Sequence, residues 1–328
     1  MNALRSGTNG RLKCWLLALV CALPFASVLA APITGATYFP NVLLTTQDGK
    51  QVKFYDDLVK GKAVAINIIY TSCTDECPLE TARMAEVQRL LGQHVGKDVF
   101  FYSISIDPEK DTAPVLKAYS EKFGVGPGWL FLTGKKEDIK LLTGKLGLTR
   151  ESDAINKDGH ASSLMLGSDV TGQWMRNSAV DNPKFLATTM ANFYGWKDVN
   201  LTKSYVEATE VNITKARFLF ESRCASCHTV GDGDGIGPDL NGVTARRDSA
   251  WLRRYLKEPE KVLAEGDPIA KALFEKYRKV NMPNLNLGTD DILTMVAYLS
   301  AQSDAATAKA KLQQGAAKAN PEEHHHHH

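Results

Sequence analysis

The sequence predicts an α/β layered domain followed by a smaller all-helical domain. From about residue 33 to 196, β-branched apolar runs alternate with stretches of helical periodicity. From about residue 205 to 303, only helical patterns follow. The chain has 328 residues, a length typical of two domains. We therefore expect domains at 33–196 and 205–303, joined by a linker at 197–204.

The first domain is expected to be built around a buried central strand. The apolar run at 63–70 predicts a buried central strand, and residues 99–106 predict a second. The other expected elements are helices at 78–91, 113–123 and 137–146, a strand at 129–132, and a hairpin of 163–166 and 173–176 around Gly172. Strands that alternate with helices of this length imply an α/β layered fold.

The second domain is expected to be built from helices at 214–223, 249–257, 268–277 and 290–301. Thr289 is the expected N-cap of the last helix, since two aspartates follow it at the positive end of the dipole. The tail at 304–328 is expected to be a fraying helix or disordered. Its final run of histidines is either a purification tag or a metal-binding tail.

The first 30 residues have the pattern of a signal peptide. A positively charged start precedes an apolar stretch at 14–28, and small residues follow at a suitable cleavage point. The segment therefore directs export to the periplasm, and it is either cleaved or retained as a membrane anchor.

Composition excludes one class of partner and points to redox chemistry. The formal net charge is +2 without a large basic block, so nucleic acid is not an expected partner. Outside the signal segment, the four cysteines form two close pairs, Cys73 with Cys77 and Cys224 with Cys227. Such spacing indicates chemistry more than a scattered disulfide framework.

The second pair lies in the sequence CASCH at 224–228, which is the attachment motif of c-type haem. The two thiols add to the haem vinyl groups, and His228 ligates the iron. A zinc site or redox C-x-x-C is the alternative, but a small, helical and exported domain favours haem.

This half of the chain resembles the class I cytochrome c family over about a hundred residues. The resemblance is carried by the attachment motif after a helix with Phe218 and Phe220, by GIGPDLNG at 235–242, and by Met282-Pro283 before the final helix. It implies one covalent haem c, with the Pro238 carbonyl accepting a hydrogen bond from His228. It also implies Met282 as the second axial ligand, whereas Met295 is expected in the core. His/Met ligation makes an electron carrier without an open iron position.

The first pair lies in TSCTDECP at 71–78, where the central strand ends and a helix begins. A helix N-terminus lowers thiol pKa values, and four-residue spacing places both sulfurs on one side of the turn. Two such thiols can form a disulfide or bind a soft metal such as Cu(I).

Residues 33–196 resemble the Sco/SenC copper proteins, which have a thioredoxin-like fold. The resemblance is carried by C-x-x-x-C-P, by SIDPEKDT at 105–112, by WLFLTG at 129–134, and by a histidine ahead of the hairpin. It implies one copper ion bound by Cys73, Cys77 and His160. Gly159 stands where the family usually has aspartate. His94 is expected to be solvated, and Asp107 and Asp111 to be turn and cap residues.

Three functions remain open at this point. The resemblance implies a copper chaperone that assembles cytochrome c oxidase, with subunit II or a similar copper acceptor and redox proteins as partners. The fused haem would then exchange electrons with the copper–thiol site. The alternatives are an enzyme, a thiol-disulfide reductase that acts through Cys73 and Cys77 on apo copper-site cysteines, and a plain electron-transfer cytochrome with a docking domain.

Overall fold

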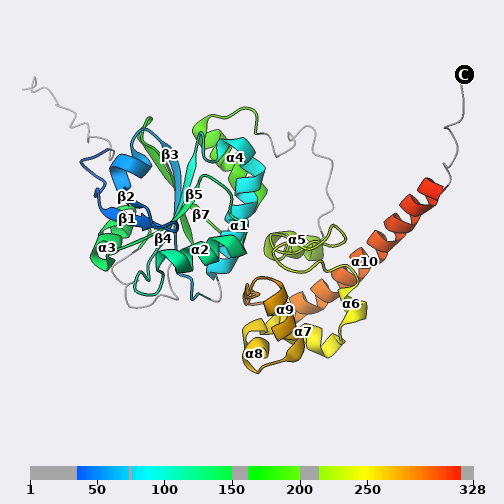
Figure 1. Cartoon of the computed structure of the whole chain (residues 1–328). Coiled ribbons are helices and arrows are strands. Elements are labelled where there is room, and N and C mark those ends of the chain that lie inside the picture. The colour runs from blue at the N-terminus through cyan, green and yellow to red at the C-terminus, as the bar shows by residue number, and fades with distance from the viewer. Residues whose placement is uncertain (1–34, 74–75, 150–161, 200–213, 319–328) are drawn as a thin grey trace, which may run out of the picture. The chain divides into compact units, whose positions relative to one another are not determined.

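The computed structural model describes residues 35–73, 76–149, 162–199 and 214–318, with side chains to residue 305 (Figure 1). The signal segment, His160 and the terminal histidine run lie outside these residues. Within the described part of the chain, no helix combines the length and the apolar character that crossing a membrane requires.

The described part of the first domain contains a seven-stranded mixed sheet in the order β2-β1-β5-β4-β3-β6-β7. Its three central strands, β3, β4 and β5, are parallel, and the outer pairs are antiparallel. The strands are β1 (Leu43–Thr46), β2 (Gln51–Lys53), β3 (Ala63–Ile69), β4 (Phe100–Ser105), β5 (Trp129–Gly134), β6 (Ser163–Ser168) and β7 (Gln173–Ser178). β1 and β2 were not predicted, because they are too short to show a period.

Helices cover both faces of this sheet, so β3 is buried on both sides. Its side chains alternate, with Ala65 and Ile69 packed on one face and Val64, Ile66 and Ile68 on the other. The first face is covered by α1 (Glu76–Leu91), α2 (Ala113–Lys122) and α4 (Pro183–Tyr194). The second is covered by the π-helical turn η1 (Phe54–Val59) and by α3 (Lys136–Lys145). Each fully buried aliphatic side chain contributes about 1.5–3 kcal/mol of transfer free energy.

Helix α4 was missed although its start is marked in the sequence. Pro183 occupies the first helical position, and the Asn182 side chain accepts hydrogen bonds from the Lys184 and Phe185 N–H groups. Asparagine followed by proline is a recognised helix start.

The regular elements among the described residues of the second domain are all helices. Its elements are α5 (Lys215–Arg223), α6 (Val243–Arg246), α7 (Ser249–Lys257), α8 (Pro259–Ala264), α9 (Pro268–Lys276) and α10 (Thr289–Lys318). α5 packs against α10, and the rings of Phe220 and Tyr298 lie 5.5 Å apart. Thr289 is the first residue of α10 rather than its cap. α10 continues past residue 301 because alanine, lysine and glutamine are strong helix formers.

The expectation that His94 is solvated is wrong. Only 8% of the residue is exposed, and its ring stacks on Trp196 with the centroids 4.3 Å apart. Nδ1 lies 2.7 Å from an Asp98 carboxylate oxygen and Nε2 lies 3.0 Å from one of Asp198. The fold brings the last residues of the domain onto the end of α1, a contact between segments about a hundred positions apart that no local pattern reveals.

Candidate functional site

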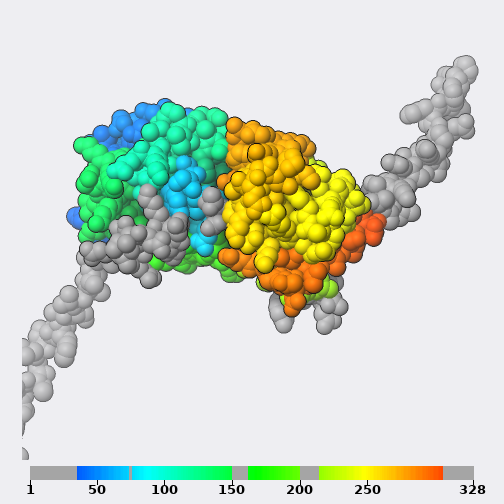
Figure 2. Space-filling view, turned by 90° about the horizontal axis from the view of Figure 1, so that it is seen from below, coloured from blue at the N-terminus to red at the C-terminus, as the bar shows by residue number. Residues whose placement is uncertain are grey.

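The turn between β3 and α1 carries the first cysteine pair. The Cys73 N–H donates to the Tyr70 carbonyl at 3.2 Å, and the Cys77 N–H donates to the Cys73 sulfur at 3.4 Å. No disulfide bond joins the two cysteines. Ser72 and Glu76 are exposed, and the light-blue part of Figure 2 shows this segment at the surface of the first domain. The two cysteines are therefore adjacent, on a turn that has exposed neighbours.

The two thiols differ in burial and in acidity. Cys73 is half-buried, whereas Cys77 is fully buried. A hydrogen bond with the Cys73 thiol, and then burial, raise the pKa of Cys77 far above its usual value. The expectation that the helix N-terminus lowers the pKa of both thiols is therefore wrong for Cys77. Its own backbone N–H points at Cys73, so the helix favours negative charge on the Cys73 sulfur.

A buried carboxyl group lies one helical turn beyond the pair and was missed in the sequence. Glu80 is only 1% exposed. Burial, together with the charge of Glu76, raises the pKa of the Glu80 carboxyl to about 8. Desolvation disfavours the ionised form of a carboxyl group, so Glu80 is largely protonated at neutral pH. Its signal in the sequence is weak, because a glutamate on a helix is usually exposed.

Ser162 contacts the start of α1. Ser162 donates a hydrogen bond from its hydroxyl to the Glu76 carboxylate at 2.7 Å. Among the described residues, no three His, Cys, Asp or Glu side chains converge as a metal site. The predicted third ligand, His160, lies outside that part of the chain.

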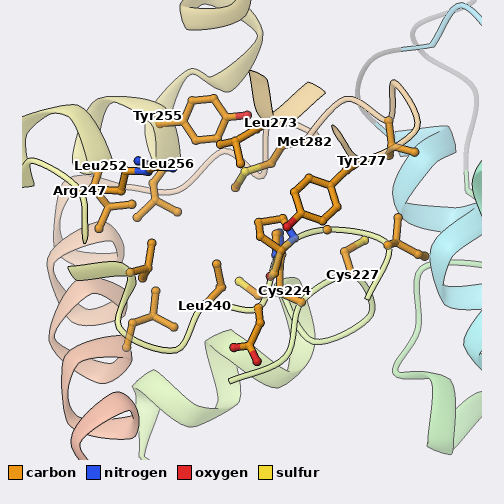
Figure 3. A pocket seen from close by; sticks show the side chains of 18 of the residues that line it. Cys224, Cys227, Leu240, Arg247, Leu252, Tyr255, Leu256, Leu273, Tyr277 and Met282 are labelled. Atoms are coloured by element: carbon orange, nitrogen blue, oxygen red, sulfur yellow. Dashed lines mark hydrogen bonds between the residues drawn. The ribbon is translucent and has the colours of Figure 1, made fainter. Parts of the chain in front are cut away.

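The second domain holds an apolar cavity bordered by the second cysteine pair, with about 1100 Å³ of space, part of it open to solvent. Figure 3 shows the sulfurs of Cys224 and Met282 on opposite sides of this space. His228 also lines the cavity, and Leu252 and Leu256 of α7 form part of its wall. Buried apolar side chains around a thiol pair, an imidazole and a thioether suit a haem, which is a large flat apolar ring.

The imidazole of His228 is held in one orientation. Its Nδ1 lies 2.9 Å from the Pro238 carbonyl oxygen, which can only accept, so Nδ1 carries the proton and Nε2 is left with its lone pair. Burial lowers the pKa of His228, which favours the neutral ring. A neutral imidazole with a fixed tautomer is the form that binds a metal.

Two glycines allow the loop to pass close to this histidine. A Cβ atom on Gly237 would lie 2.6 Å from Cε1 of His228, and one on Gly235 would lie 2.8 Å from the Cys227 carbonyl oxygen. The Gly237 N–H donates to that same carbonyl at 2.8 Å. Close packing of the motif at 235–242 against the CASCH segment therefore requires glycine at both positions.

Fold and sites together define a two-domain redox protein, with a thiol pair in the sheet domain and a haem cavity in the helical domain. The chain belongs to the SCO1/SenC family, whose model matches residues 34–188. A model of the cytochrome c family matches residues 213–303, and this second domain is a cytochrome c domain that takes haem c. The predicted α/β domain followed by an all-helical cytochrome c domain is thus confirmed.

Similar proteins cover mainly the first domain. An SCO2-like protein of Rickettsia conorii is 30% identical over 145 residues, which is 42% of this chain and 69% of that protein. An SCO2-like protein of Rickettsia felis is 31% identical over 39% of this chain and 64% of its own length. This chain therefore spans about two thirds of the length of these relatives. A protein of Stutzerimonas stutzeri with the name "Putative copper-binding protein" is 28% identical over 46% of this chain and 78% of its own length.

Solved structures match each domain separately. The copper-bound ScoI of Bradyrhizobium japonicum is 26% identical, with a TM-score of 0.38, and covers 46% of this chain and 96% of that chain. The cytochrome c domain of a Pseudomonas putida protein is 46% identical, with a TM-score of 0.26, and covers 27% of this chain and 88% of that chain.

Proposed function

We propose that this chain is an exported protein that binds one copper ion in its first domain and carries electrons through one haem c in its second. The observation that carries the proposal is the contact between the two cysteines at the start of α1, where the Cys77 backbone N–H donates to the Cys73 sulfur at 3.4 Å. Two adjacent sulfur ligands select a soft metal such as Cu(I). Family membership supports copper in this role, since related proteins have been solved with copper bound.

His160 is proposed as the third copper ligand. Ser162, two residues further along, is hydrogen-bonded to Glu76 in the first turn of α1, next to Cys77. His160 lies only two positions before Ser162, so an imidazole at position 160 can reach both sulfurs. An imidazole added to two thiolates supplies a ligand set that accepts both Cu(I) and Cu(II).

In the second domain, Cys224 and Cys227 are proposed to hold the haem through thioether bonds. His228 and Met282 are proposed as its axial ligands, since both line the cavity. The Pro238 carbonyl keeps the imidazole in the tautomer that presents Nε2. When bound, the haem supplies one-electron redox chemistry, and the apolar wall of the cavity keeps water away from it.

We propose that the protein acts in the periplasm in the assembly of a copper-containing oxidase, such as cytochrome c oxidase. Cu(I) and Cu(II) prefer different ligand environments, so an electron source can control when copper is taken up or released. In a chain that combines both redox centres, the haem is the electron source for the copper site. The copper acceptor is then subunit II of the oxidase or a similar protein.

Metal titration of the full chain tests the copper site. The reduced protein should bind one Cu(I) in competition with a chromophoric chelator, and the Cys73→Ser and Cys77→Ser variants should lose it. His160→Ala should weaken binding, and the exposed Ser72→Ala change should leave it unaltered. Unchanged tight binding in either cysteine variant would contradict the proposal.

The unequal burial of the thiols favours a second candidate function. A half-buried Cys73 beside a fully buried Cys77 is the arrangement of an attacking and a resolving thiol in disulfide exchange. The protein would then reduce the cysteines of an apo copper site. Copper-stripped protein that reduces a disulfide peptide with the oxidase copper-site sequence supports this function, and protein that does so only with copper bound argues against it.

A further inference from the structure

A second buried carboxyl group lies under the cysteine turn. Asp111, expected to be a turn or cap residue, is only 1% exposed, and Thr112 is the residue that caps α2. The hydrogen-bond donors to Asp111 among the described residues are a backbone N–H group and two neutral hydroxyl groups. A buried carboxyl group is costly unless hydrogen bonds satisfy it, so its partners show what it holds in place.

Three hydrogen bonds reach this carboxyl group from the described residues, and two of them come from Thr71. The Thr71 N–H donates at 3.1 Å and the Thr71 hydroxyl at 2.5 Å, one to each oxygen. The third comes from the Ser105 hydroxyl at 2.6 Å, at the end of β4. The carboxyl group therefore connects Thr71, just after β3, to Ser105 at the end of β4, the neighbouring parallel strand.

Thr71 is the second residue before Cys73, so its position helps to set the path of the chain into the cysteine turn. Tyr70 accepts the Cys73 N–H at 3.2 Å, so the turn closes on the residue next to Thr71. The Cys77 N–H reaches the Cys73 sulfur only if this turn keeps its shape. A rotation at Thr71 would move Cys73 away from the start of α1.

We propose that Asp111 is a positioning residue for the thiol pair, acting through Thr71 to hold the Cys73 sulfur against the start of α1. This role rests on the proposed use of the two sulfurs as metal ligands. It predicts that loss of the Asp111–Thr71 contact changes the relative reactivity of the two thiols while the sheet domain remains folded.

The test compares Asp111→Asn, Thr71→Val and Thr71→Ser in the full chain with haem attached. Thr71→Val removes the hydroxyl donor and Thr71→Ser retains it. Thr143→Val is the matched control, because that buried hydroxyl donates within α3 on the opposite face of the sheet. The readouts are the ratio of iodoacetamide alkylation rates at the two cysteines, located by peptide mass spectrometry, and the Cu(II) EPR spectrum of the copper-loaded protein.

Asp111→Asn and Thr71→Val should each lower the ratio of Cys73 to Cys77 alkylation by about fivefold, the usual effect of one lost hydrogen bond. They should also alter the Cu(II) EPR spectrum. Thr71→Ser and the control should match the wild type in both readouts. If Asp111→Asn does not fold, the two Thr71 variants decide the question.

Wild-type ratios and spectra in a folded Thr71→Val protein would overturn the role of Asp111. This result is distinct from failure of the copper site itself. If the copper site itself fails, the wild-type protein does not take up copper through Cys73 and Cys77, while the alkylation ratio still reports on Asp111.

Discussion

Replacing Glu80 by glutamine should remove most of the pH dependence of the stability of the first domain. The carboxyl group has its pKa raised from 4.5 to about 8 by burial, so the fold binds its proton. Its stabilising effect is complete below about pH 4.5 and is lost progressively as the pH rises through 8. At about 1.4 kcal/mol for each pH unit, the loss reaches about 3 kcal/mol at pH 7 and about 5 kcal/mol above pH 8.

Glutamine has similar size and no charge, so Glu80→Gln should match the wild type near pH 4.5 and exceed it by about 3 kcal/mol at pH 7. Urea unfolding of reduced, copper-free protein between pH 5 and 8 measures this, with hydrogen exchange of β3 and β4 reporting on the sheet domain separately from the haem domain. Glu86→Gln, a partly exposed position on the same helix, is the control. Parallel pH profiles for the wild type and Glu80→Gln would refute the reasoning.

Three further predictions concern single side chains. Iodoacetamide should modify Cys73 before Cys77, because burial protects the second thiol and raises its pKa; equal rates in peptide mass spectrometry would contradict this. Gly237→Ala should reduce covalent haem content, measured by the pyridine haemochrome assay, because the new methyl group overlaps the haem-site imidazole. Gly144→Ala meets no neighbour within 4 Å and should retain full haem, and equal haem in both proteins argues against the steric reason. His94→Leu should lower the free energy of unfolding of the first domain by about 1–3 kcal/mol, because two carboxylates lose a partner. An unchanged midpoint in urea unfolding would show that these two contacts contribute nothing to stability.

The parts of the fold that sequence predicted are those encoded locally. The run at 63–70 became β3, and the CASCH segment lies on the haem cavity with Pro238 beside its histidine. The apolar face of residues 249–257 became part of the cavity wall. Each of these is set by neighbours within a few positions or by one repeating period.

The missed features depend on contacts between distant residues. Asp111 meets Thr71 across 40 positions, and His94 meets Asp198 across 104. The burial of Glu80 depends on how α1 lies on the sheet. Polar residues such as these look like ordinary surface residues until the fold supplies their partners.

The place of β3 in the sheet has a consequence for how the protein matures. β3 pairs with β4 on one side and with β6, about a hundred residues further along, on the other. Closing so long a loop is slow, and it requires the chain to have emerged as far as Ser168. Until then Cys77 is not buried, and both thiols are exposed to the surrounding oxidants in an unfolded segment. Under the proposed export, the chain should therefore need a reductant during biogenesis, even though the finished fold protects one of the two sulfurs.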